Sequence, residues 1–223
     1  MNASPSPADR AEVRRIAGDL RAAVDGGRAG TGQVSAERRH AERRHAELAR
    51  RADRAGLLDV AYRTVDSPIG PLLLAATQEG LVRVAFHVED HDAVLQRLAT
   101  DISPRILRAP PRLDTVARQL GEYFAGSRRA FDLPVDLRLA HGFRREVLDH
   151  LMAIPYGRTE SYTEVARASG NPKAVRAAGS ACSHNPVPVV VPCHRVVRID
   201  GSIGQYLGGT ETKVWLLAME SAA

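Results

Sequence analysis

The chain has 223 residues, 44% of them hydrophobic, and a formal net charge of +5. This length suits one large or two small domains, and the hydrophobic fraction is ordinary for a soluble protein with a core. Its two cysteines, Cys182 and Cys193, exclude a disulfide scaffold and a four-cysteine zinc site. The sequence has neither a membrane-length apolar run nor a signal peptide's apolar middle, so we expect a cytoplasmic protein without membrane contact.

The positive charge is unevenly distributed along the chain. Residues 1–56 hold 12 arginines and 8 acidic residues, residues 57–137 hold 9 basic and 11 acidic ones, and residues 138–223 hold 10 basic and 7 acidic ones. The last part is modestly basic, as phosphate contacts require, but charge alone does not establish DNA binding.

Residues 1–57 read as a polar extension rich in Arg and Ala. A short amphipathic helix is predicted by four apolar residues at helical spacing, Val13, Ile16, Leu20 and Val24. The repeat AERRH over residues 36–45 favours a solvated helix, because Glu and Arg lie three and four residues apart. Almost nothing in it can be buried, so we expect an exposed or partly disordered appendage. An arm that adds nonspecific DNA affinity is the less favoured alternative.

Between residues 58 and 137 the pattern changes to strands. Three are predicted, over residues 60–65, 72–76 and 81–86. Tight turns separate them, which indicates an antiparallel meander. Two helices follow, around residues 94–98 and 113–124. No set of residues in this segment indicates catalysis or metal binding, and we interpret the segment as a scaffold.

Residues 138–223 begin with helices. One is predicted over residues 143–154, and Ser161 with Glu164 matches a capping box that begins a second helix, ended by Gly170. Asn171-Pro172 then supplies a cap and a favoured first residue for a third helix, to about Cys182. The last two form either a helix-turn-helix pattern or an ordinary helical hairpin.

The third of these helices is rich in small residues, which let a helix backbone approach a surface closely. Most helix-turn-helix proteins read bases in the major groove with long polar side chains, and this helix has few. The composition of this helix favours sequence-independent contact in the minor groove, with Arg176 as its one long side chain that could enter the DNA. The alternative is an exposed arginine bonded to phosphate or solvent.

The segment NPVPVVVPCHRVV at residues 185–197 places a thiol, an imidazole and a guanidinium side by side. Its valine run predicts a buried strand, which Pro192 ends, with Cys193 just beyond it. A free cysteine usually serves as a small buried hydrophobe, and this is our interpretation of Cys182.

Cys193 differs from Cys182 in its neighbours. His194 can serve as a base or relay, and Arg195 adds positive potential that favours a thiolate. Asn185 offers an amide nearby. Together these residue types indicate a nucleophilic cysteine.

The motifs resemble those of the O6-alkylguanine-DNA alkyltransferases, also called methylated-DNA-protein-cysteine methyltransferases. The matching segments are NPVP at residues 185–188, PCHRV at 192–196, GSIGQYLGG at 201–209 and KVWLLAME at 213–220. The resemblance implies an α/β (α+β) fold. In that fold, a small ribonuclease-H-like domain at residues 58–137 precedes a winged-helix-like, helix-turn-helix catalytic domain at residues 138–223.

The resemblance also implies direct-reversal DNA repair. An alkyl group, chiefly methyl, would pass from O6-alkylguanine, or from O4-alkylthymine, to Cys193 once per molecule. A water would link Cys193 to His194, with Glu220 orienting the imidazole. Asn185 would brace the active-site turn, and Tyr162 would hydrogen-bond a guanine ring nitrogen.

Further roles follow from the same resemblance. Arg176 would be an arginine finger that fills the space left by the flipped nucleotide. Other DNA-contacting residues would be Lys173, Ala177, Ala178, Gly179 and Arg195. The base pocket would comprise Val196, Tyr206, Leu207 and Gly208. Leu207 departs from the small or polar residue of many relatives, which leaves the range of adduct sizes open. We expect a monomer on double-stranded DNA, without metal or organic cofactor.

Three other protein classes compete with this interpretation. Alkyltransferase-like proteins bind lesions but lack the reactive cysteine that this chain has. Regulators of the adaptive response carry a cysteine-rich metal domain, for which two cysteines are too few. A cysteine hydrolase needs an acyl pocket and an oxyanion hole, and the sequence indicates neither.

Overall fold

The structure is a computed structural model that describes residues 31–221, with side chains from residue 40 onward. It divides into two compact units, residues 1–58 and 59–223. The helix expected around Val13 to Val24 lies outside the described residues. No helix in the described part of the chain is long and apolar enough to cross a membrane.

The described part of the first unit is a helix, α2 (Thr31–Arg54). Arg50 contacts Glu47, three residues earlier, at 2.6 Å, in keeping with the predicted solvated helix. The described residues of the repeat, 40–45, are exposed or half-buried, and the buried side chains of the helix are Ala49 and Ala52, beyond the repeat, among residues 40–54.

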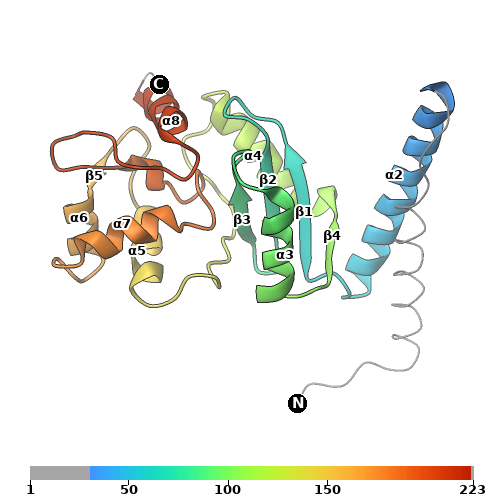
Figure 1. Cartoon of the computed structure of the whole chain (residues 1–223), viewed down its shortest axis with the longest axis horizontal. Coiled ribbons are helices and arrows are strands. Elements are labelled where there is room, and N and C mark those ends of the chain that lie inside the picture. Colours follow the sequence, from blue (N-terminus) through green and yellow to red (C-terminus); the bar gives the residue numbers. More distant parts are fainter. Residues whose placement is uncertain (1–30, 222–223) are drawn as a thin grey trace, which may run out of the picture. The chain divides into compact units, whose positions relative to one another are not determined.

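The second unit begins with a four-stranded sheet of order β3-β2-β1-β4 (Figure 1). Its strands are β1 (Val60–Val65), β2 (Leu72–Ala76), β3 (Leu81–Ala85) and β4 (Ile106–Arg108). The first three form the predicted antiparallel meander. β4 pairs in parallel with β1 and was not predicted, because three residues are too few to show a strand period.

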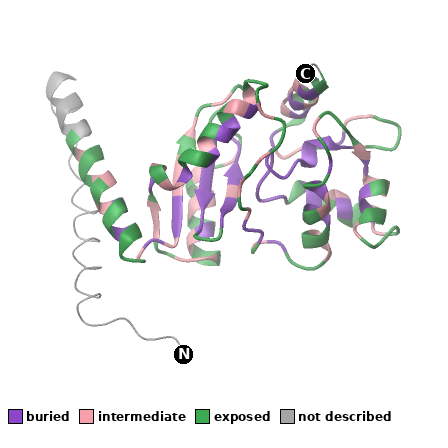
Figure 2. Ribbon diagram, turned by 180° about the vertical axis from the view of Figure 1, so that it is seen from behind, coloured by how far each residue is buried: buried purple, intermediate pink, exposed green. Residues whose placement is uncertain are grey.

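Two helices complete this half, α3 (His91–Asp101) and α4 (Asp114–Phe124), and a 3₁₀ turn over Pro110–Leu113 precedes α4. Leu98 of α3 packs with Val60 and Val82 of the sheet in one buried cluster. In Figure 2 the buried residues follow the strands, and every residue of β2 is buried. Apolar burial of this kind is the main stabilising contribution to such a fold.

The other half contains α5 (Phe143–Leu151), α6 (Tyr162–Ala168), α7 (Val175–Ser183) and α8 (Thr210–Ser221). α7 packs against both α5 and α6, and the three helices lie together in Figure 1. A two-stranded parallel pair, β5 (Glu160–Ser161) with β6 (Val196–Val197), joins the start of α6 to the segment after Cys193.

The start of α6 confirms the predicted capping box. Ser161 Oγ accepts the Glu164 backbone N–H at 3.2 Å, and Glu164 Oε2 accepts the Ser161 N–H at 2.6 Å. The start of α7 was predicted wrongly, because the helix begins at Val175 rather than at Pro172. Asn171 Oδ1 instead accepts the Lys173 N–H and caps a turn before the helix.

The valine run at residues 189–191 does not form the predicted strand. Val189 has a positive φ of 74°, and Val191 N donates to Val187 O at 2.9 Å, so the chain makes a tight turn. Pro186, Pro188 and Pro192 have no backbone N–H, which prevents regular strand pairing here. The run is buried as expected, but burial alone does not distinguish a strand from a buried turn.

Candidate active site

Cys193 opens a single 3₁₀ turn, Cys193–Arg195, and its side chain is buried. Asn185 Nδ2 donates to Cys193 Sγ at 3.1 Å and to Val191 O at 2.8 Å. Asn185 Oδ1 accepts the Val187 N–H at 3.0 Å. One amide thus connects both ends of the valine turn to the thiol, a geometry that fits the expected brace.

His194 follows Cys193 within the same turn, so the two side chains are not held on opposite faces of a strand. His194 Nε2 lies 2.9 Å from Glu220 Oε1, and both side chains are buried. Because an ionised carboxylate only accepts hydrogen bonds, Nε2 carries the hydrogen and Nδ1 holds the free lone pair. Nδ1 is buried and has no hydrogen-bond partner among the described residues.

Glu220 is the centre of a buried hydrogen-bond network. Arg195 donates to it from Nε at 2.9 Å and from Nη2 at 2.8 Å, and the Tyr123 hydroxyl donates at 2.7 Å. The Gly157 N–H donates at 3.0 Å. Burial alone would raise the pKa of Glu220, but hydrogen bonds from His194, Arg195 and Tyr123 outweigh it and hold the pKa below its usual value.

These surroundings also set the protonation of the imidazole. Burial lowers the pKa of His194, and the hydrogen bond and negative charge of Glu220 only partly oppose this effect. The imidazole is therefore neutral at pH 7 and can accept a proton at Nδ1.

Arg195 lies in a different environment from the one expected. Besides contacting Glu220, its Nη1 donates to Ile154 O at 2.5 Å, and the residue is only 6% exposed. Its guanidinium faces the buried network rather than the surface, which differs from the expected DNA contact. Arg195 instead stabilises the charge of Glu220.

The thiol needs help to ionise. Burial raises the pKa of Cys193 to about 11, against the opposing effects of the Asn185 hydrogen bond and the positive charge of Lys213. Lys213 is itself buried, and its Nζ donates to Val196 O at 2.5 Å. At neutral pH the thiol is protonated, so it reacts only with a base that removes its proton.

Sequence reasoning assigned no role to Tyr123 or Lys213. Tyr123 lies in α4, in the half interpreted as a scaffold, and only the fold brings it to Glu220. Lys213 belongs to the KVWLLAME segment, and its burial beside Val196 is the signal that distinguishes it. Burial is a property of the structure, so nothing in the sequence alone separates Lys213 from a solvated lysine.

Tyr162 is the first residue of α6, and its ring lies between two glycines. A Cβ at Gly204 would come within 2.7 Å of the Tyr162 hydroxyl oxygen, and one at Gly179 within 3.9 Å of its ring. Burial, and then the nearby thiols of Cys182 and Cys193, raise the pKa of Tyr162. The hydroxyl therefore stays protonated and can donate a hydrogen bond.

β6 and the loop after it carry the expected pocket residues. The Tyr206 ring lies edge-on to His194, with centroids 6.4 Å apart, and burial raises the pKa of its hydroxyl well above the usual value. Leu207, Asn185 and Pro186 line one side of a cavity of about 550 Å³. Cys193 does not line this cavity, which adjoins the Asn185 side of the site. Val196, in β6, and Gly208, next to Leu207, are buried.

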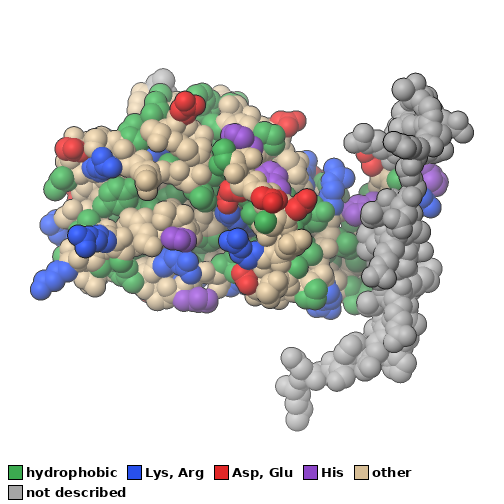
Figure 3. All heavy atoms as spheres, in the orientation of Figure 1, with side chains coloured by type: hydrophobic (Ala, Val, Ile, Leu, Met, Phe, Trp, Pro, Cys, Tyr) green, Lys and Arg blue, Asp and Glu red, His purple; other side chains and the backbone are tan. Residues whose placement is uncertain are grey.

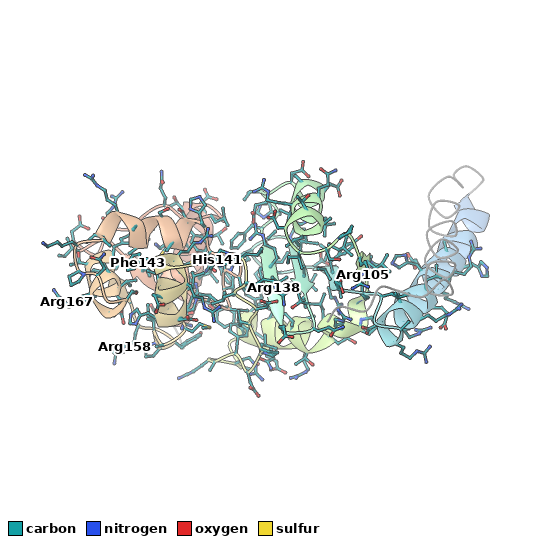
Figure 4. All side chains as sticks on the ribbon, turned by 90° about the horizontal axis from the view of Figure 1, so that it is seen from below. Arg105, Arg138, His141, Phe143, Arg158 and Arg167 are labelled. Atoms are coloured by element: carbon teal, nitrogen blue, oxygen red, sulfur yellow. The ribbon has the colours of Figure 1, made fainter. Side chains whose placement is uncertain are left out.

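The expected DNA-contacting residues in α7 and in the turn before it separate into two groups. Lys173, Arg176 and Ala177 are exposed and Gly179 is half-buried, whereas Ala178 is fully buried and faces the interior, unlike the expectation. Lys and Arg side chains are spread over the surface of α5, α6 and α7 in Figure 3. Figure 4 shows Arg158 and Arg167 pointing outward on the side of the molecule that contains these helices.

Among the described residues, no group of three His, Cys, Asp or Glu side chains could hold a metal ion.

Cys182 is buried, and burial raises the pKa of its thiol, with the neighbouring Cys193 adding to the effect. Its thiol lacks the Asn185 contact that Cys193 has. The chemistry of the site thus depends on Cys193 and its hydrogen-bonded neighbours.

Two family models match the chain. Residues 60–137 match the ribonuclease-like domain of 6-O-methylguanine DNA methyltransferase, and residues 142–222 match its DNA binding domain. Among curated proteins, the methylated-DNA–protein-cysteine methyltransferase of Mycolicibacterium paratuberculosis is 42% identical, over 72% of this chain and 92% of that protein. The constitutive enzyme of Bacillus subtilis is 36% identical, over 71% and 94%.

Solved structures agree with these matches. The crystal structure of Mycobacterium tuberculosis O6-methylguanine methyltransferase is 38% identical, with a TM-score of 0.65 over 73% of this chain and 93% of that one. The structure of Mycobacterium tuberculosis OGT in complex with DNA gives a TM-score of 0.64 at the same identity and coverage. The chain therefore belongs to the 6-O-methylguanine DNA methyltransferase family.

Proposed function

We propose that this protein repairs DNA by moving an alkyl group, chiefly methyl, from O6-alkylguanine to Cys193. The observation that carries the proposal is the pair of buried hydrogen bonds made by Cys193 and by its neighbour His194. Asn185 donates to Cys193 Sγ, and the adjacent His194 has its Nε2 occupied by Glu220 and its Nδ1 free. A nucleophile, a base and an orienting carboxylate are the parts that this reaction needs.

The first step is ionisation of the thiol. A water between Cys193 Sγ and His194 Nδ1 would carry the proton to the neutral imidazole. Glu220 would then stabilise the imidazolium, and its own ionisation depends on Arg195 and Tyr123. The positive charge of Lys213 favours the thiolate that remains.

The second step is alkyl transfer. The thiolate attacks the alkyl carbon, a C–S bond forms, and the carbon's bond to O6 breaks with its electron pair left on guanine. Tyr162 would donate a hydrogen bond to a guanine ring nitrogen and so reduce the charge that develops there. No side chain of the site could hydrolyse the product thioether, so each molecule would act once.

DNA binding would use residues of α7 and of the turn before it. Lys173 would contact phosphate, and Ala177 and Gly179 would let the helix lie close to the minor groove. Arg176 would occupy the space left by the flipped nucleotide, and the pocket formed by Val196, Tyr206, Leu207 and Gly208 would receive the base. We propose a monomer that acts on double-stranded DNA in the cytoplasm, with residues 58–137 and 138–223 as its two domains.

The test is mass spectrometry of the purified full chain after mixing with a duplex that contains one O6-methylguanine. We expect one added methylene on the Cys193 peptide and restored guanine in the duplex. Cys193→Ala should not react. Cys182→Ala is the matched control, because it removes the other buried thiol, and it should react fully. An unmodified wild-type protein that still binds the lesion would refute the transfer and favour lesion recognition.

A substrate series distinguishes the possible lesions. The same duplex with O4-methylthymine in place of O6-methylguanine tests the second substrate. If Cys193 gains a methylene from both, the pocket accepts either base; if it gains one only from O6-methylguanine, the pocket selects purines.

A further inference from the structure

The end of β3 and Phe86, which follows it, contact two separate parts of the candidate active site. Residues 83–86 lie in the half of the protein where the sequence indicated neither catalytic nor metal-binding residues. One contact is made to Pro186, beside Asn185, and the other to the loop that holds Tyr206 and Gly208. The first contact is made by hydrogen bonds and the second by ring packing, so this half of the protein supports the site on two sides.

The first contact fixes the Asn185 turn. Val84 N donates to Pro186 O at 2.9 Å, and Arg83 Nη1 donates to the same oxygen at 3.2 Å. The Arg83 guanidinium is held in turn by Glu89. Pro186 directly follows Asn185, whose side chain donates to Cys193 Sγ. By holding the Pro186 carbonyl, β3 therefore restrains Asn185.

The second contact fixes the pocket loop. The Phe86 ring is fully buried and lies edge-on to Tyr206, with centroids 5.5 Å apart. A Cβ at Gly208 would lie 2.9 Å from the Phe86 ring, so only glycine allows the loop to approach this closely. Glu89, which holds Arg83, also accepts the Phe86 N–H at 2.8 Å.

We infer that Arg83 and Phe86 are positioning residues for alkyl transfer, which set the Asn185 turn and the Tyr206–Gly208 loop on the two sides of Cys193. The inference rests on the proposed function. Tyr206 also lies against His194, so Phe86 acts on the loop and, through it, on the imidazole. A displacement of reacting groups of about 1 Å can lower a rate about 100-fold, so such contacts affect the reaction without touching the substrate.

The test measures single-turnover alkyl transfer with the full chain in excess over a duplex containing one O6-methylguanine. The maximal rate and the half-saturating protein concentration are determined separately. We expect Phe86→Leu, Gly208→Ala and Arg83→Met each to lower the maximal rate about tenfold, with half-saturation changed by less than about twofold.

A double variant gives the decisive comparison. In Phe86→Leu/Gly208→Ala the new methyl group occupies space that the ring has left, so we expect most of the lost rate to return. Residues in contact show this kind of non-additivity, whereas independent sites do not. Rates that simply multiply, or single variants as fast as the wild type, would overturn the inference.

Val60→Ala is the matched control. Val60 lies in the buried cluster with Ala75, Val82 and Leu98, so this change weakens the same half without altering either contact. We expect it to react at the wild-type rate, and an equal loss of rate would mean that general destabilisation explains the effect. If Phe86→Leu does not fold, Arg83→Met carries the test. Failure of the wild type to transfer methyl would refute the proposed function, which is a separate result.

Discussion

The guanidinium of Arg195 contacts both carboxylate oxygens of Glu220, Nε to Oε2 at 2.9 Å and Nη2 to Oε1 at 2.8 Å, with both side chains buried. His194 Nε2 shares Oε1. A charged pair of this kind keeps the carboxylate ionised, and an ionised carboxylate keeps the hydrogen on Nε2 of the imidazole. The arginine next to the histidine thus determines which histidine nitrogen is free.

Replacing Glu220 by Gln should both destabilise the protein and slow the reaction. The change leaves the Arg195 guanidinium buried without a counter-charge, and breaking a buried pair typically costs about 3–5 kcal/mol. Urea unfolding at pH 7 measures the loss. Glu211→Gln, on the exposed first turn of α8, is the control and should change the free energy of unfolding little. Equal stability of the two variants would contradict the assigned role.

The lowered pKa of Glu220 also predicts that the stability of the protein depends on pH. The pKa of Glu220 is lowered in the folded protein, so its contribution is fully present above its ordinary value of 4.5 and is lost as the pH falls toward the folded value. The stability difference between wild type and Glu220→Gln should therefore be largest near pH 7 and shrink below pH 4.5. A difference independent of pH between 7 and 3 would contradict the lowered pKa.

Arg176 and Arg195 should respond differently to substitution. Arg176→Ala should slow transfer from a duplex by about tenfold or more, because unstacking a base costs a few kcal/mol, while leaving transfer from the free base O6-benzylguanine unchanged. Arg195→Met should slow both substrates and lower the unfolding temperature. If Arg176→Ala slowed the free base equally, its proposed role in nucleotide flipping would be wrong.

Asn185→Ala should shift the pH dependence of transfer. The Asn185 hydrogen bond lowers the pKa of Cys193, so its removal raises that pKa further above the usual value, and the rate should rise with pH only at more alkaline values. Single-turnover rates between pH 6 and 10 measure the shift. Asn171→Ala, which removes an exposed turn cap, is the control and should keep the wild-type profile.

Leu207→Ser should widen the range of adducts. Leu207 is half-buried in the loop that would receive the base, and a shorter side chain leaves more room for a large O6 substituent. We expect the ratio of the O6-benzylguanine rate to the O6-methylguanine rate to rise in the variant. A fall in both rates with an unchanged ratio would show that Leu207 supports the loop rather than limiting adduct size.

Local signals predicted local structure well. The capping box of Ser161 and Glu164 was evident from residue types three positions apart, and the structure has both of its hydrogen bonds. The antiparallel meander followed from turns between apolar runs. The valine run failed because a buried turn and a buried strand have the same composition, and three prolines decided between them.

The rest of the site depends on contacts between distant parts of the chain. Tyr123 and Glu220 are 97 residues apart, and no local pattern connects them. The direction of the Arg195 side chain was equally hidden, because a residue beside a nucleophile can face DNA or the interior. Burial of Ala178 was hidden for the same reason, because α7 packs against α5 and α6 and the sequence does not show which of its small residues face them.

The last turn of a helix normally frays, because its carbonyl groups lack partners within the helix. Glu220 lies in the last turn of α8, yet four groups from elsewhere in the fold bond its carboxylate. Opening this turn would break all of these contacts at once. Amide hydrogens near Glu220 should therefore exchange with solvent as slowly as those of the buried strands.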